Sequence, residues 1–341
     1  MTSKRNKLST INVLSLYVIL TIGIIGFTLV SICIGVSDIT VGNVFNIICS
    51  RLGITSLAEE ISHGQEMIII NLRVPRVLMA LLVGINLSTT GAVYQALFRN
   101  DMADPYMLGI SAGASFGAGI GIMINGFLPM WAFMGAIFAN ILVIVLAGVK
   151  GRVSTIRLLL AGLAINYFFS AVLSYLKIQS EDSQMAMFAW GMGTLAGSTY
   201  KRLIILGVIT LIVVVVFMTY RKELNMLLLG EEVAISMGVS THKVMWVLFG
   251  TSSLLIATTV AFTGTIGFVG LIIPHIVRII FGSDYKKTIP ICMFLGMYFV
   301  LFCDDIARSV IPNKEVPIGI ITSLIGAPYF MWLLHRNRRA R

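Results

Sequence analysis

The chain has 341 residues, of which 57% are hydrophobic and 12% charged, and its formal net charge is +10. Soluble globular domains carry about twice that charged fraction, so the composition excludes a soluble enzyme. The mean hydropathy of +0.93 indicates a membrane protein instead. A helix needs roughly 20 apolar residues to cross the bilayer core, so about ten spans fit within this length.

Ten apolar runs of spanning length follow one another along the chain. They are residues 11–34, 67–98, 106–124, 129–148, 156–178, 202–220, 243–263, 267–281, 288–311 and 317–334. Runs such as ILVIVLAGV are continuously apolar, whereas the strands of a membrane barrel alternate in polarity. We therefore predict an all-α polytopic membrane protein with about ten transmembrane helices. Residues 1–341 should form a single transmembrane domain.

The distribution of basic residues predicts the orientation. The first apolar run is too long for a cleavable signal peptide, and ten spans place both termini on one side. If that side is the cytoplasm, 17 of the 25 Lys and Arg residues lie inside, as the positive-inside rule requires. The net charge is then a topology signal, and we expect no nucleic-acid partner. The basic tail 335–341 is expected to anchor this topology or to contact anionic membrane lipid.

Motifs for covalent chemistry are missing from the sequence. There is no GxxxxGK[ST] phosphate loop, so another chain must bind ATP if the protein uses it. The central parts of the spans carry almost no charged residues, which counts against an ion-coupled secondary carrier. The four histidines are scattered, which counts against a haem-binding redox subunit. We expect no catalytic residue, no metal and no cofactor in this chain.

Small and polar residues within the spans allow two interpretations each. Glycines recur every four residues from Gly109 to Gly121; they predict close helix packing, with a substrate channel as the alternative. Gly264 to Pro274 predicts a broken helix. Asn86 and Asn166 lie inside apolar runs, where an amide needs a partner or water. They either face a translocation cavity or form hydrogen bonds between helices.

The segment between the sixth and seventh runs combines acidic and apolar residues. It reads LNMLLLGEEVAISMGVSTHKV and is too short and too polar to span a membrane. The pattern predicts a short helix ended by Gly238. It is either a docking helix for a cytoplasmic partner or a solvated loop.

Three arginines lie toward the opposite side, against the overall charge trend. Arg73 and Arg76 precede the core of the second run, and Arg308 lies near the end of the ninth. They are either interfacial anchors or a docking site for an acidic protein, because guanidinium pairs bidentately with carboxylate. Asp304 and Asp305 are also placed to pair with Arg308 on the same helix.

Seven segments in this order resemble the FecCD family of ABC importer permeases, which serve iron-siderophore, haem and vitamin B12 transport. They are LRVPRVLMALLVG (72–84), GAVYQALFRNDMADPYMLGISAGAS (91–115), RLLLAG (157–162), LLLGEEVAISMGVS (227–240), GTIGFVGLIIPHIVR (264–278), DDIAR (304–308) and VPIGIITSLIGAPYFMWLL (316–334). The resemblance implies a type II ABC importer permease fold with ten transmembrane helices. Such a permease is not an enzyme.

The resemblance also implies partners and sites. The partners would be a second permease subunit, a cytoplasmic ATPase dimer that binds the ATP, and an extracellular substrate-binding protein. ATPase coupling would fall in 227–242, and docking of the binding protein at Arg73, Arg76 and Arg308. The expected coupling residues are Gly230, Glu231, Val233, Ala234, Met237 and Gly238. The cargo would be an iron chelate of the siderophore type, carried across a bacterial cytoplasmic membrane. Haem or cobalamin import is the alternative within the family, and an ion-coupled carrier is the alternative outside it.

Overall fold

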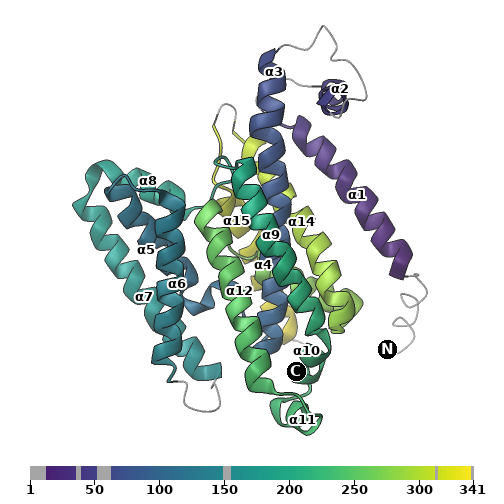
Figure 1. Ribbon diagram of the computed structural model, residues 1–341, viewed down its shortest axis with the longest axis vertical. Helices are drawn as coiled ribbons and strands as arrows, with labels where there is room; N and C mark the ends of the chain where they lie inside the picture. Colours follow the sequence, from purple (N-terminus) through teal and green to yellow (C-terminus); the bar gives the residue numbers. More distant parts are fainter. Residues whose placement is uncertain (1–12, 36–39, 52–62, 149–154, 312–313, 339–341) are drawn as a thin grey trace.

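The computed structural model describes residues 13–35, 40–51, 63–148, 155–311 and 314–338, which form helices joined by short connections (Figure 1). Lys4, Arg5 and Lys7, which belong to the basic residues predicted to lie in the cytoplasm, are outside these ranges. The last three residues of the basic tail are outside them as well. The elements are α1 (Val13–Cys33), α2 (Val41–Arg51), α3 (His63–Ile68), a π-helical turn η2 (Ile69–Arg73), α4 (Val74–Leu97), a 3-10 turn η3 (Pro105–Leu108), α5 (Ile110–Met123), α6 (Leu128–Leu146), α7 (Thr155–Gln179), α8 (Glu181–Gly191), α9 (Tyr200–Thr219), α10 (Arg221–Leu228), α11 (Glu231–Ser236), α12 (Thr241–Thr263), α13 (Val269–Phe281), α14 (Tyr285–Ser309) and α15 (Ile318–Arg338).

The described helices correspond to the ten predicted spans. Seven are long and apolar enough to cross a membrane, and three shorter apolar helices, α5, α13 and α15, supply the remainder. The predicted all-α polytopic fold is therefore confirmed. The second span differs in detail, because α3, η2 and α4 form one continuous helix of 35 residues from His63 to Leu97. A π-turn inserts an extra residue into a helix, and here it ends at Arg73.

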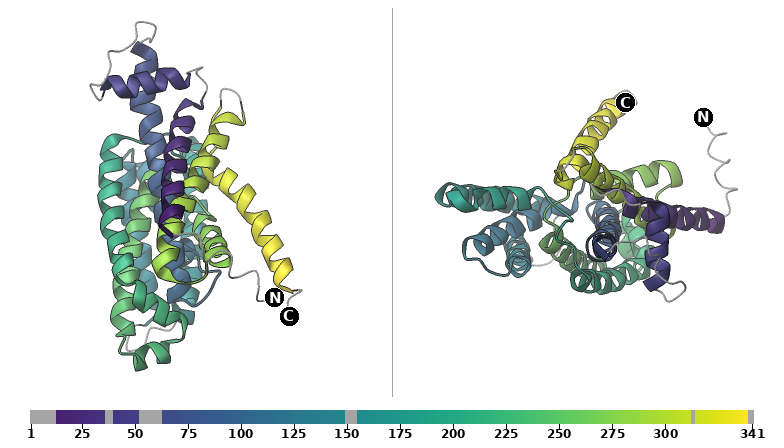
Figure 2. Two further views of the ribbon diagram at one scale, coloured as in Figure 1. Left: turned by 90° about the vertical axis from the view of Figure 1, so that its right-hand side faces the viewer. Right: turned by 90° about the horizontal axis from the view of Figure 1, so that it is seen from above.

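Helix α4 is the centre of the bundle. Seen from above, the other helices surround it (Figure 2), and it packs against α14, α13, α9 and α12. A Cβ atom on Gly84 would collide with the backbone of Gly296 in α14, and one on Gly91 would collide with the backbone of Gly270 in α13. Glycine allows this close approach of helix backbones.

Helices α5 and α6 form a second tightly packed pair. Gly113 and Gly117 of α5 lie against Gly135 of α6, with no room for a Cβ atom on any of the three. The glycine repeat is therefore a packing surface, as predicted. Ser111 and Ser115 lie on another face of α5, where they line the cavity described below.

The predicted helix break falls between α12 and α13. Helix α12 ends at Thr263 and α13 begins at Val269, after Phe268 with a φ of 69°. Protein groups bond the exposed backbone: Thr194 N–H donates to the carbonyl of Thr263 at 2.7 Å. Such irregular backbone is tolerated at membrane depth only when the protein satisfies it. Pro274 itself lies inside α13.

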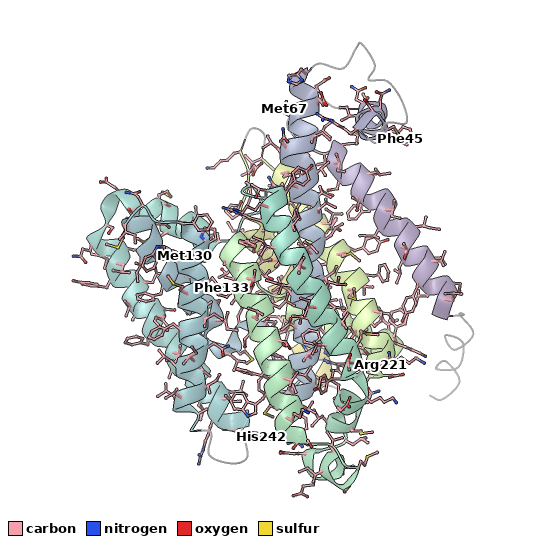
Figure 3. All side chains as sticks on the ribbon, in the orientation of Figure 1. Phe45, Met67, Met130, Phe133, Arg221 and His242 are labelled. Atoms are coloured by element: carbon pink, nitrogen blue, oxygen red, sulfur yellow. The ribbon has the colours of Figure 1, made fainter. Side chains whose placement is uncertain are left out.

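The two ends of the bundle differ. We call the end with α2, α3 and α8 the upper end and the end with α10 and α11 the lower end, as drawn in Figure 1. In Figure 3, Phe45 and Met67 lie at the upper end, and Arg221 and His242 at the lower end. Helix α1 runs toward the upper end and α15 runs away from it. The first residue of α1 and the last residue of α15 therefore both lie toward the lower end (Figure 2). Large apolar side chains are exposed along α1, α7 and α9, as expected of a lipid-facing surface.

Candidate functional site

A cavity of about 700 Å³ lies between α5, α7, α8 and α15. One face of α7 contributes Asn166, Ser170, Ser174 and Lys177, which recur every three or four residues. The polar lining residues are Asp104, Tyr106, Ser111, Ser115, Asn166, Ser170, Ser174, Lys177, Thr265 and Ser323. Hydroxyl and amide groups predominate, so the cavity offers hydrogen bonds to a polar solute.

Several breaks between helices meet at this cavity. The segments 104–107, 191–192 and 265–267 each contribute lining residues. Hydrogen bonds hold these segments in place. Ile266 N–H donates to the Tyr106 hydroxyl at 3.3 Å, and Gly319 N–H at the start of α15 donates to the Met192 carbonyl at 3.1 Å. The Asp104 carboxylate accepts the Tyr106 N–H at 2.8 Å and caps η3. The broken backbone is thus held in place while it borders open space.

The structure separates the two asparagines singled out in the sequence. Asn166 lines the cavity, and its amide donates to the Tyr106 carbonyl at 3.5 Å. Asn86 is fully buried away from it. Its amide nitrogen donates to Thr259 Oγ1 at 3.1 Å, and its oxygen accepts from Thr210 Oγ1 at 2.9 Å. Asn86 therefore links α4 to α9 and α12. Of the two interpretations drawn from the sequence, this is the hydrogen bond between helices and not a position facing the cavity.

The three arginines meet at the upper end in what we call the arginine cluster: Arg73, Arg76 and Arg308 with Asp304 and Asp305. Arg73 is the last residue of the π-turn, Arg76 lies on α4, and the other three residues lie on α14. All five residues are buried, with no more than 8% of their surface exposed. The structure brings the predicted docking arginines together, but it also supplies each with partners inside the chain.

Asp304 is the shared acid of the cluster. Arg76 Nε lies 3.0 and 3.1 Å from its two carboxylate oxygens, and Arg76 Nη2 lies 3.0 Å from Oδ1. Arg308 Nε lies 3.0 Å from Oδ2. Arg308 also pairs with Asp305, as the spacing on α14 predicted. Removing one partner from such a buried set leaves an uncompensated charge, which typically costs about 3–5 kcal/mol.

Helix α1 contributes to the same cluster through its last turn. Arg73 Nη1 donates to the carbonyls of Ile32 and Cys33 at 2.9 and 2.8 Å, and Arg308 Nη1 donates to the Ile34 carbonyl at 2.7 Å. The final carbonyls of a helix lack partners within the helix, so the guanidinium groups cap α1. Sequence reasoning missed this role, because nothing in residues 31–34 indicates which side chain reaches them.

Glu315 is a further residue that sequence reasoning missed. It lies between α14 and α15, and its Oε1 is 2.7 Å from Arg76 Nη1. Half of its side-chain surface is exposed, in contrast to the fully buried Asp304. The acidic residue follows Arg308 by seven positions in an irregular connection, so helical spacing could not assign it to a partner.

The predicted short helix is present at the lower end as α11. It follows Gly230, whose φ is 121°, and Gly238 comes after it with a φ of 85°. Glu231 and Glu232 occupy its first turn, where the helix dipole favours acids.

One face of this helix is exposed and apolar. Val233 and Met237 are 43% and 53% exposed and lie four residues apart, whereas Ala234 is fully buried against the bundle. Leu229 and Ile235 are also exposed nearby. We call Leu229, Val233, Ile235 and Met237 the α11 patch. Clustered apolar side chains at a polar end of a protein are typical of contact surfaces.

Helix α10, which leads to α11, is fastened to the start of α14. The Asn225 amide donates to the Asp284 carboxylate at 2.9 Å, and Tyr285 N–H donates to Asn225 Oδ1 at 2.9 Å. The bond from Asn225 lowers the pKa of Asp284 below its ordinary value, and the Lys286 N–H acts in the same direction. Because the folded-state pKa is lowered, this stabilisation is present at neutral pH and is lost only as the pH falls through that lowered pKa.

Comparisons with known proteins agree with this arrangement. The model of the FecCD transport family matches residues 20–336. The hemin transport system permease HmuU of Yersinia pestis is 36% identical over 80% of this chain and 84% of its own length. The cobalamin import system permease BtuC of Halobacterium salinarum is 38% identical over 81% of this chain and 75% of its own length. Other curated relatives are named as iron chelatin and molybdate permeases.

A solved structure matches over almost the full length. It is described as an inward-facing conformation of a metal-chelate type ABC transporter, and it covers 94% of this chain and 99% of its own, with 30% identity and a TM-score of 0.81. The relatives are transport permeases and not enzymes. The chain belongs to the FecCD transport family and is an ABC importer permease.

Proposed function

We propose that the chain imports an iron chelate of the siderophore type across a bacterial cytoplasmic membrane. Residues 1–341 act as one permease domain without a cofactor of its own, paired with a second permease subunit. A cytoplasmic ATPase dimer binds the ATP, and an extracellular binding protein delivers the cargo. The lower end and both termini face the cytoplasm. The observation that carries the proposal is one polar cavity with an arginine cluster at the upper end and an apolar helix patch at the lower end.

The fold provides a physical link between the two ends. Helix α14 has 25 residues and is roughly 37 Å long at about 1.5 Å per residue. Asp284 fastens its lower end to α10, and Arg308 belongs to the cluster at its upper end. When ATP closes the ATPase subunits, a push on α11 reaches α10 and α14, and the bundle around the cavity opens to the other side.

Cargo identity is tested through the binding protein of the same transport system. We expect it to bind a ferric siderophore and to deliver it to permease–ATPase complexes in proteoliposomes, with uptake that requires ATP. Haem, cobalamin and molybdate serve as competing ligands in the same assay. Tight binding and ATP-driven uptake of one of these instead would replace the siderophore assignment. Uptake that follows a proton or sodium gradient without ATP would favour a secondary carrier.

The α11 patch is the proposed ATPase contact. Val233→Asp and Met237→Asp place a charge on its exposed apolar face, so each should uncouple ATP hydrolysis from uptake without removing the protein from the membrane. Ile124→Asp is the matched control, because Ile124, the residue after α5, is 55% exposed, similar to Met237 at 53%. ATPase rate and uptake are measured in the same proteoliposomes. Full coupled transport in both α11 variants would show that the ATPase binds elsewhere.

Docking of the binding protein is proposed at the arginine cluster. Arg76→Lys keeps the charge but loses the bidentate fork, so it should weaken association about ten-fold; Arg76→Glu and Arg308→Glu should weaken it more, in a salt-sensitive way. Lys201→Gln removes an exposed cation at the upper end as a control. Affinity is measured in nanodiscs alongside thermal stability, because the arginines also stabilise the fold. Unchanged affinity of the folded variants would leave the cluster with a structural role alone.

The cavity is the proposed translocation pathway, with Asn166 on its wall. In a background lacking Cys33, Cys49, Cys292 and Cys303, Asn166→Cys should react with a water-soluble thiol reagent. Asn86→Cys should stay protected, since Asn86 is fully buried between α4, α9 and α12. Mass spectrometry measures the labelled fraction in each nucleotide state. Protection at position 166 in all states would contradict the pathway, and labelling at position 86 would show that this part of the bundle opens during transport.

A further inference from the structure

The guanidinium of Arg76 is shared between two carboxylates of different character. Its Nε and Nη2 atoms face Asp304, which is fully buried and also held by Arg308. Its Nη1 atom faces Glu315 at 2.7 Å, and half of that side chain is exposed. The inner carboxylate is fixed by two arginines, whereas the outer one has Arg76 alone among the salt bridges found in the described residues.

The balance of charges in the cluster favours a carboxylate at the position next to Arg76 Nη1, which Glu315 occupies. Among the described residues the three arginines of the cluster are matched by three acids, namely Asp304, Asp305 and Glu315. If Glu315 moved away, the cluster would keep one unmatched positive charge at a largely dehydrated site. Leaving such a charge unpaired is unfavourable, so the position that Glu315 leaves favours another carboxylate.

The backbone next to Glu315 is anchored to α14, so the exchange involves the half-exposed side chain of Glu315. The residue lies in the short connection between α14 and α15, where Val316 N–H donates to the Ala307 carbonyl at 3.0 Å. Gly319, four residues further on, lines the cavity. A change at Glu315 therefore occurs beside the first turn of a helix that forms the cavity wall.

We propose that Glu315 is an internal stand-in for the partner: it holds Arg76 in the free permease and is displaced by a carboxylate of the docking protein. The inference rests on the proposed docking at the arginine cluster. The exchange proceeds because an exposed ion pair is weak, whereas a charge-assisted hydrogen bond covered by a docked protein is shielded from water and salt. Docking thereby frees the side chain of Glu315, three residues before α15 begins.

The test compares Glu315→Gln with Asp182→Asn in the full-length permease in nanodiscs. Asp182 is an exposed acid of α8 at the same end, so its variant controls for the loss of one negative charge. Without its internal competitor, the Glu315→Gln permease should bind the substrate-binding protein about two- to five-fold more tightly. Asp182→Asn should change the affinity by much less. Equal gains in both variants would reveal a general charge effect and overturn the proposal.

A second measurement does not need the partner. Phenylglyoxal modifies accessible arginines, and mass spectrometry reports the rate at Arg76. The Glu315 carboxylate pairs with Nη1, and a neutral glutamine holds the guanidinium less firmly. The rate should therefore rise several-fold in Glu315→Gln and stay unchanged in Asp182→Asn. An unchanged rate in Glu315→Gln would mean that Glu315 does not shield Arg76.

A double substitution separates the exchange from docking itself. In an Arg76→Lys background, which retains charge but loses the fork, the affinity gain from Glu315→Gln should shrink or vanish. If no arginine variant lowers the affinity, the docking site is wrong. If the arginine variants lower it but Glu315→Gln binds no more tightly, docking stands and the exchange alone is overturned.

Discussion

The need to satisfy every backbone hydrogen bond at membrane depth is the constraint on which this structure depends. It makes long apolar segments helical, and it permits breaks only where protein groups replace the missing helical bonds. Here the breaks before α5, after α8 and before α13 meet and bond to one another. The cavity lies where they meet. The same constraint that builds the bundle therefore also determines where a polar cavity can exist within it.

Close helix packing gives the bundle its rigidity. Glycine pairs let α4 touch α14 and α13, and another set joins α5 to α6. Buried polar groups add specific links, such as Asn86 with two threonines on neighbouring helices. A well-packed interior transmits displacement rather than absorbing it, which suits a protein in which events at opposite ends must be coupled.

The arginine cluster stabilises the fold, and in the proposed function the same residues also bind the partner. Its guanidinium groups cap α1 and fix the end of α14, so the fold depends on them. Arg76 also extends a donor to the half-exposed carboxylate of Glu315. A binding site made from stabilising residues is held rigid before the partner arrives, which reduces the entropy lost on association.

The class of the protein, its ten spans and the short helix near residue 231 could all be predicted from the sequence. These depend on local properties: hydrophobic run length, the frequency of glycine and the spacing of acids on one helix. The pairing of Arg308 with Asp305 was also predictable, because three residues along a helix bring side chains together.

Contacts between segments far apart in the sequence became visible only in the folded bundle. Two asparagines in similar apolar runs took different roles, because Asn86 faces threonines of α9 and α12 whereas Asn166 faces the breaks around the cavity. The contact of Arg76 with Glu315 joins residues 239 positions apart. No local spacing encodes such contacts, since they arise only when α4, α14 and the connection to α15 are packed into one bundle.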